Sequence, residues 1–163
     1  MRASMAEQER SRAAGLRFPV LCLTREMGVC VAGRERDLER CSAAVFWRGR
    51  FFEGLRLVDA TGQTHEVVRA TIRRPATWVG RRLARLLDLT ITVGVETRSA
   101  GAASVDEIRR IIEQAVDEDA EAFEEFSGHD VEWWRGTLAA SHTVEELMRA
   151  LQALGMGKQG RDS

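Results

Sequence analysis

A hairpin-forming stretch in the middle of the chain constrains the fold more than any other feature. It covers residues 51–74 and has the turn sequence DATG, from Asp59 to Gly62, near its centre. Asp at the first turn position and Gly at the fourth favour a type I turn closed by a residue with left-handed backbone. Apolar residues such as Leu57 and Val67 alternate with polar ones on both sides. This alternation predicts two antiparallel strands, each with one face towards water.

Further strands are predicted on both sides of the hairpin. Short runs of aliphatic and β-branched residues predict strands at Val20–Leu23, Val29–Val31, Ala43–Trp47 and, most clearly, Leu89–Thr97. Pro75 ends the second strand of the hairpin, because proline cannot donate a hydrogen bond to the ladder. The small residues at 98–103 predict a loop.

Helices are predicted at residues 34–41, 79–87, 104–126, 130–140 and 143–154, the last ended by Gly155. Ser104 and Thr143 each precede a glutamate by three residues, which is the pattern of a capping box at a helix start. The helix at 79–87 carries its arginines on one polar side. Strands therefore come first and helices afterwards.

This order indicates an α+β fold, with a mainly antiparallel sheet of four to six strands in the N-terminal two thirds covered by C-terminal helices. We expect a flexible tail at 1–15, one domain at 16–155 and a disordered tail at 156–163. A chain of 163 residues can bury enough apolar surface to fold without disulfides. No glycine-rich fingerprint follows a strand, which argues against a doubly wound nucleotide-binding fold.

The composition favours an intracellular globular protein. Cysteines occur only at positions 22, 30 and 41, an odd number without the spacing of a disulfide framework or a CxxC zinc site. The N-terminus lacks an apolar signal core, and no stretch approaches the ~18 apolar residues of a membrane span. We therefore expect a cytoplasmic protein with no membrane partner. Arginine outnumbers lysine 23 to one, a bias that we attribute to a GC-rich genome.

The sequence contains no convincing catalytic or metal-binding pattern. The histidines, His65, His129 and His142, have no ligand spacing on a predicted helix face. Cys41 is the one thiol in a polar context, and nothing in the sequence directs a histidine towards it. Asp59 is best explained as a turn former. We therefore expect a non-enzymatic protein with no catalytic residues, no metal and no cofactor, although an enzyme site assembled from distant residues stays open.

Charge is distributed unevenly along the chain. Residues 1–85 hold 17 basic and 9 acidic residues, a net charge of +8, whereas residues 86–163 hold 7 basic and 16 acidic residues, a net charge of −9. No basic residue lies between Arg110 and Arg135. Such a run is explained either as a solvated helix face or as a surface that attracts a basic partner.

If the acidic run is a binding surface, its neighbouring tryptophans supply an aromatic anchor. Trp133 and Trp134 point about 100° apart on a helix, so at least one is expected to be partly exposed. We select Trp134 as the anchor; the alternative is that Trp133 packs inside and Trp134 rests its ring on the helix junction. The predicted partner-binding residues are Asp117, Glu118, Glu121, Glu124, Glu125, Asp130, Glu132 and Trp134.

The arginines of the basic half suggest a different function. A stripe for phosphates is conceivable from Arg69, Arg73, Arg74, Arg81, Arg82 and Arg85. Nucleic acid is not the favoured partner, because lysines and interleaved aromatic residues are missing. The alternative is that these arginines pair with acidic helices of their own chain.

The layout of FEGLRLVDATGQTHEVV followed by an acidic half ending in SHTVEELMRAL resembles small bacterial immunity-type proteins, which inhibit secreted toxins. The resemblance implies a protein without an active site that binds a basic toxin domain through an acidic surface. This is the favoured functional prediction. The alternative is a module that binds a small ligand or nucleic acid through its arginine-rich face.

Overall fold

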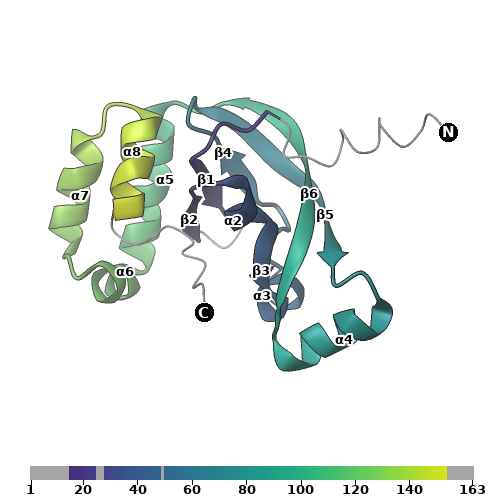
Figure 1. The fold of residues 1–163 in the computed structure, drawn as a ribbon. Helices are drawn as coiled ribbons and strands as arrows, with labels where there is room; N and C mark the ends of the chain where they lie inside the picture. Colours follow the sequence, from purple (N-terminus) through teal and green to yellow (C-terminus); the bar gives the residue numbers. More distant parts are fainter. Residues whose placement is uncertain (1–14, 25–27, 49, 154–163) are drawn as a thin grey trace.

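The computed structural model describes residues 15–24, 28–48 and 50–153 (Figure 1). Its six strands form one antiparallel sheet in the order β2-β1-β4-β5-β6-β3. The strands are β1 (Val20–Leu23), β2 (Val29–Ala32), β3 (Arg40–Ser42), β4 (Arg56–Val58), β5 (Gln63–Arg74) and β6 (Thr90–Ala102). The predicted α+β class and the predicted antiparallel sheet are confirmed.

The helices lie between the strands and after the last of them. They are α2 (Glu35–Glu39), α3 (Ala43–Trp47), α4 (Trp78–Leu87), α5 (Val105–Glu118), α6 (Ala120–Ser127), α7 (Val131–Ala140) and α8 (Val144–Leu151). The capping box predicted at Thr143 is complete. Of the box predicted at Ser104, only the hydrogen bond from the backbone N–H of Glu107 to the serine hydroxyl is present among the described contacts. The predicted tails before residue 15 and after residue 155, and the helix end at Gly155, lie outside the described residues.

The predicted turn at the centre of the hairpin is confirmed. Gly62 has a φ of +84°, and its N–H donates to the carbonyl of Asp59 over 2.9 Å. Oδ1 of Asp59 accepts from the N–H and the hydroxyl of Thr61 and from the N–H of Gln63. The aspartate therefore acts as the turn former that the sequence indicates. The second strand of the hairpin ends at Arg74, directly before Pro75.

The structure differs from the predicted elements in four places. The helix predicted at 104–126 is divided at Asp119 into α5 and α6, and the helix predicted at 34–41 ends at Glu39, where β3 follows. Ala43–Trp47 is helix α3 and not a strand, because the hydroxyl of Ser42 caps it by accepting from the N–H of Val45, and Asp88 accepts from the N–H of Ala44. Residues 98–102 are strand and not loop. Small residues form a strand there because β5 runs beside them and pairs with residues on both sides of an irregularity at Ala100. Local sequence does not encode this long-range pairing.

The sheet curls, and its two faces bury separate hydrophobic clusters. Alternate residues of β1 point in opposite directions, so that Val20 and Cys22 join the cluster inside the curl and Leu21 and Leu23 join the other. The inner cluster also contains residues of α2 and α3. The outer cluster contains residues of α5, α7 and α8, which cover one end of the sheet (Figure 1).

The long β5–β6 hairpin connects two different ends of the molecule. Its first end meets the helices, since the carbonyl of Gly62 accepts from the N–H of Ala103 just before α5. Its other end extends away from those helices and carries α4 (Figure 1). We call the two regions the helical end, α5 to α8, and the α4 end.

Candidate functional site: an arginine–tryptophan groove

Helix α4 is held at the α4 end by its caps and by one arginine. Thr77 caps its start by accepting from the N–H of Gly80, and Asp88 ends it with a left-handed backbone, φ +49°. The Asp88 carboxylate binds the first turn of α3 through the N–H of Ala44, over 2.6 Å. Arg81 donates from its guanidinium to the carbonyls of Pro75 and Ile72. These contacts fix α4 beside α3.

The spacing of 100° per residue gives α4 three distinct stripes. The narrow inner side holds Ala84, which is 2% exposed. The arginine stripe consists of Trp78, Arg81, Arg82 and Arg85. The apolar stripe consists of Val79, Leu83, Leu86 and Leu87, all of which are exposed. The helix therefore has basic and aliphatic surfaces side by side.

The arginine stripe faces a groove of about 610 Å³ between α3 and α4. Its lining consists of Trp47, Arg48, Trp78, Arg81, Arg82, Arg85 and Leu86. Four guanidinium groups and two indoles thus surround one space, and no carboxylate is among the described residues that line it. We call this feature the arginine–tryptophan groove.

The groove is partly organised before any ligand enters. The guanidinium of Arg82 lies over the ring of Trp78, 5.4 Å from its centroid, and that of Arg85 lies 6.0 Å from the centroid of Trp47. Such cation–π contacts orient the side chains without neutralising them. None of the groove's four arginines forms a salt bridge with a described residue. Their positive charge is therefore available to a partner.

The other predicted arginines do not join this groove. Arg73 pairs with Glu39 over 3.4 Å, as the self-pairing alternative expects. Arg69 lines a separate cavity of about 410 Å³ near Phe46. Arg74 is exposed at the end of β5. Of the predicted arginines, only Arg81, Arg82 and Arg85 come together. They are joined by Arg48, which the sequence analysis did not identify because it follows a separate element, as the C-cap residue of α3.

The predicted acidic surface lies at the helical end, and part of it is internally compensated. Arg135 donates to Asp117 over 2.9 Å and to Glu132 over 2.8 Å. The hydrogen bond and charge of Asp117, followed by those of Glu132, raise the pKa of Arg135. Oδ1 of Asp130 accepts from the N–H of Trp133 and so caps α7. Asp117, Asp130 and Glu132 therefore each have a partner within the chain.

The remaining acidic residues are less constrained. Glu118 accepts a hydrogen bond from the side-chain amide of Gln114 over 3.0 Å. Glu121, Glu124 and Glu125 are exposed on α6 and make no ion pair with any described residue. Within the predicted acidic surface, these three carboxylates are the ones without a described partner.

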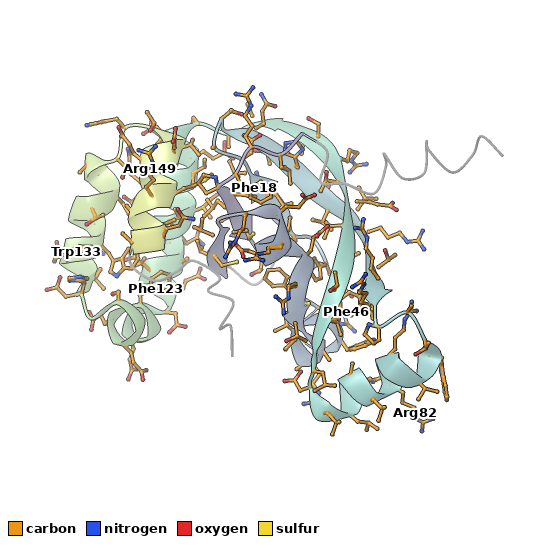
Figure 2. The ribbon with its side chains drawn as sticks, in the orientation of Figure 1. Phe18, Phe46, Arg82, Phe123, Trp133 and Arg149 are labelled. Atoms are coloured by element: carbon orange, nitrogen blue, oxygen red, sulfur yellow. The ribbon has the colours of Figure 1, made fainter. Side chains whose placement is uncertain are left out.

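The prediction of Trp134 as an exposed anchor is wrong. Trp134 is 1% exposed, and its indole N–H donates to the hydroxyl of Ser127 over 3.0 Å. It faces inward with Leu138, which lies one turn further along α7. Trp133 is instead the exposed one, at 39%, and stacks on His129 with 3.8 Å between ring centroids. It lies at the outer edge of the helical end (Figure 2).

No other described cluster has the composition of a reactive centre. His65 lies 3.9 Å from the carboxylate of Asp59, but that carboxylate already holds the hairpin turn. Within the described ranges, no group of three or more His, Cys, Asp or Glu residues could hold a metal ion. Among the helices of the described chain, none is long and apolar enough to cross a membrane. No family model, curated protein or solved structure matches this chain.

Proposed function

We propose that this chain is a non-enzymatic binding protein that holds an anionic partner in the arginine–tryptophan groove. The observation that carries the proposal is the meeting of four guanidinium groups and two indoles at one groove without a carboxylate among its described lining residues. Clustered like charges repel one another, so a protein gains nothing in stability from gathering them. An anionic partner would relieve that repulsion.

The chemistry of the groove suits carboxylate or phosphate groups. A guanidinium can donate two parallel hydrogen bonds to either anion, which gives geometric specificity as well as attraction. Trp78 is 70% exposed, so its ring offers a large apolar surface to whatever enters. Exposed aromatic and arginine side chains are the residue types that dominate binding energy at interfaces.

Titration with two polyanions, poly-glutamate and oligothymidylate, tests this proposal. The protein should bind at least one of them, with an affinity that falls between roughly 50 mM and 200 mM salt. The double variant Arg82→Gln/Arg85→Gln should bind about tenfold more weakly or worse. The matched control Arg110→Gln/Arg149→Gln, which removes the same charge from α5 and α8, should bind as the parent does. Equal losses in the two variants, or none in either, would overturn the proposal.

A second candidate function is the inhibition of a basic protein, such as a toxin domain, through the helical end. The exposed carboxylates of Glu121, Glu124 and Glu125, together with the exposed ring of Trp133, support it. A polyarginine peptide is the probe. Binding that weakens in Glu121→Gln/Glu124→Gln and in Trp133→Ala would favour this function, whereas binding unaffected by all three substitutions would count against it.

A further inference from the structure

The apolar stripe of α4 is the largest concentration of exposed aliphatic side chains in the described chain. Val79 is 58% exposed, Leu83 49%, Leu86 73% and Leu87 65%, and Leu89 follows at 48%. Single exposed leucines are ordinary on protein surfaces, but a contiguous group marks an interaction site. Leu86 also lines the arginine–tryptophan groove, so the apolar stripe and the groove are continuous.

We infer that α4 docks an acidic amphipathic helix of another protein, with that helix's carboxylates on the arginine stripe and its apolar side chains on the apolar stripe. This inference rests on the proposed function and names the class of partner. The two stripes run side by side along a helix of 10 residues, which is about 15 Å long. A helix laid along α4 would present its own side chains at i, i+3, i+4 and i+7 to both stripes together.

Charge complementarity supports an acidic partner. Residues 77–87 contain three arginines and no acidic residue, and the facing α3 adds Arg48 at its end. A partner helix with glutamates on one flank could place them against guanidinium groups that no described carboxylate occupies. The aliphatic side chains next to these glutamates would then leave water together with Leu83 and Leu87, and this burial would supply affinity.

Two other anionic partners fit less well. A single strand of nucleic acid uses aromatic rings and cations, but it has no use for an adjacent aliphatic stripe. A helix that lies in an anionic bilayer carries cations along both sides of its apolar face. In α4 the arginines border the apolar stripe on one side only, and the other side holds Gly80 and the buried Ala84.

A synthetic peptide of about 20 residues tests the inference, because that length suffices for helix formation. Its design places a leucine stripe beside a glutamate stripe, and a scrambled peptide of identical composition is the control. The protein should bind the patterned peptide about tenfold more tightly than the scrambled one. The variant Leu83→Ser/Leu87→Ser should lose this preference while its affinity for poly-glutamate stays unchanged, since neither leucine lines the groove.

The outcomes separate this inference from the proposed function. A preference for the patterned peptide that survives Leu83→Ser/Leu87→Ser overturns the inference, even if Arg82→Gln/Arg85→Gln still abolishes polyanion binding. The inference is also overturned if the protein binds oligothymidylate more tightly than the patterned peptide. The same holds if it binds phosphatidylglycerol vesicles more tightly than the peptide and this binding needs Leu83 and Leu87. A third overturning result is a homodimer that sedimentation detects for the parent protein but not for Leu83→Ser/Leu87→Ser. The occupant of α4 would then be a second copy of this chain.

Discussion

The two ends of the β5–β6 hairpin satisfy their charged and apolar groups in different ways. At the helical end, Arg135 lies between Asp117 and Glu132, and the large ring of Trp134 is buried with a hydrogen bond to its N–H. At the α4 end, Arg82 and Arg85 contact tryptophan rings but no carboxylate of the described chain. The buried tryptophan and the paired arginine of the helical end thus have partners within the chain, whereas the α4 end presents arginines that no described carboxylate pairs with.

The exposed apolar residues show the same contrast. Of the nine large hydrophobic residues that are exposed in the described chain, six lie between Trp78 and Leu89. Trp133 is the one at the helical end, and it already stacks on His129. A helix as short as α4 has little stability of its own. It persists at the tip of a hairpin because Asp88 and Arg81 attach it, which leaves its outer surfaces free for binding.

The largest expected effect comes from replacing one tryptophan at each end of the molecule and comparing the losses of stability. Trp134→Ala should lower the free energy of unfolding by about 3–5 kcal/mol, because it empties a buried site next to Phe123 and Leu138. Trp78→Ala should leave that free energy almost unchanged but weaken polyanion binding, because its ring is 70% exposed. Urea unfolding of both variants provides the measurement. A similar loss of stability in the two would remove the distinction between the ends.

The sequence predicts most of the fold because its signals there are local. Alternation, the Asp59–Gly62 turn and the N-caps at 104 and 143 each depend on a few neighbouring positions. The structure has the turn and both N-caps, and the capping box is complete at Thr143. The failures depend on distant partners. Helix α3 is fixed partly by Asp88, 44 residues after Ala44, and the end of β6 is a strand because β5 extends beside it.

The candidate site could be predicted only in part. The arginines at 81, 82 and 85 stand out in the sequence as the polar side of one helix. The groove also needs Trp47 and Arg48, and only tertiary packing brings α3 beside α4. The sequence also does not determine which of the two adjacent tryptophans faces the core. If the buried face of α7 is placed one residue off, Trp133 and Trp134 exchange roles. An amphipathic pattern also does not reveal that the apolar stripe of α4 stays uncovered.

The second expected effect concerns Gly62, in the turn between β4 and β5, where the sheet meets the helical end. Gly62→Val should destabilise the protein by about 2 kcal/mol, because a β-branched residue is strained at positive φ and its Cβ would meet the carbonyl oxygen of Ala103 at 3.1 Å. Gly101 lies in β6 and not in the loop predicted at 98–103, and its φ is +101°. A new Cβ there meets nothing within 4 Å, so Gly101→Val should cost less. Thermal melts provide the measurement. A lower melting temperature for Gly101→Val than for Gly62→Val would show that the contact with Ala103 is unimportant.

The third prediction concerns acid. Burial alone would raise the pKa of Asp59, but hydrogen bonds from the side chain and backbone of Thr61, and from the backbone around Gln63, outweigh it and hold the pKa below its usual value. A carboxyl group with a lowered folded-state pKa stabilises the protein above its unfolded pKa of about 3.9, and that contribution disappears as the pH falls through the folded pKa. Asp59→Asn should therefore reduce stability at pH 7 by about 1 kcal/mol and narrow the difference from the parent at low pH.

Urea midpoints of parent and Asp59→Asn, measured at neutral pH and again below the unfolded pKa, provide the check. Asp106→Asn, on the exposed first turn of α5, is a control that should show a smaller change. A constant gap between parent and Asp59→Asn at all pH values would contradict the assigned role, because the charge of the carboxylate would then contribute nothing to the turn.

The smallest expected effect concerns the carboxylates of α6, which the helical end leaves without described ionic partners. Glu121 and Glu124 are three residues apart on one helix, so removing both charges with Glu121→Gln/Glu124→Gln should keep stability or raise it by about 0.2–0.5 kcal/mol. The gain should come mainly from Glu124, because Glu121 lies in the first turn of α6, where a negative charge is favourable to the helix dipole. Single variants compared by urea unfolding at low salt separate the two contributions. Arg135→Gln is the opposing control: it should lower stability, because Asp117 and Glu132 lose their shared partner. If Glu121→Gln/Glu124→Gln is clearly destabilised, those carboxylates stabilise the folded chain in the same way as Asp117, and the exposed face of α6 then offers no charge to a basic partner.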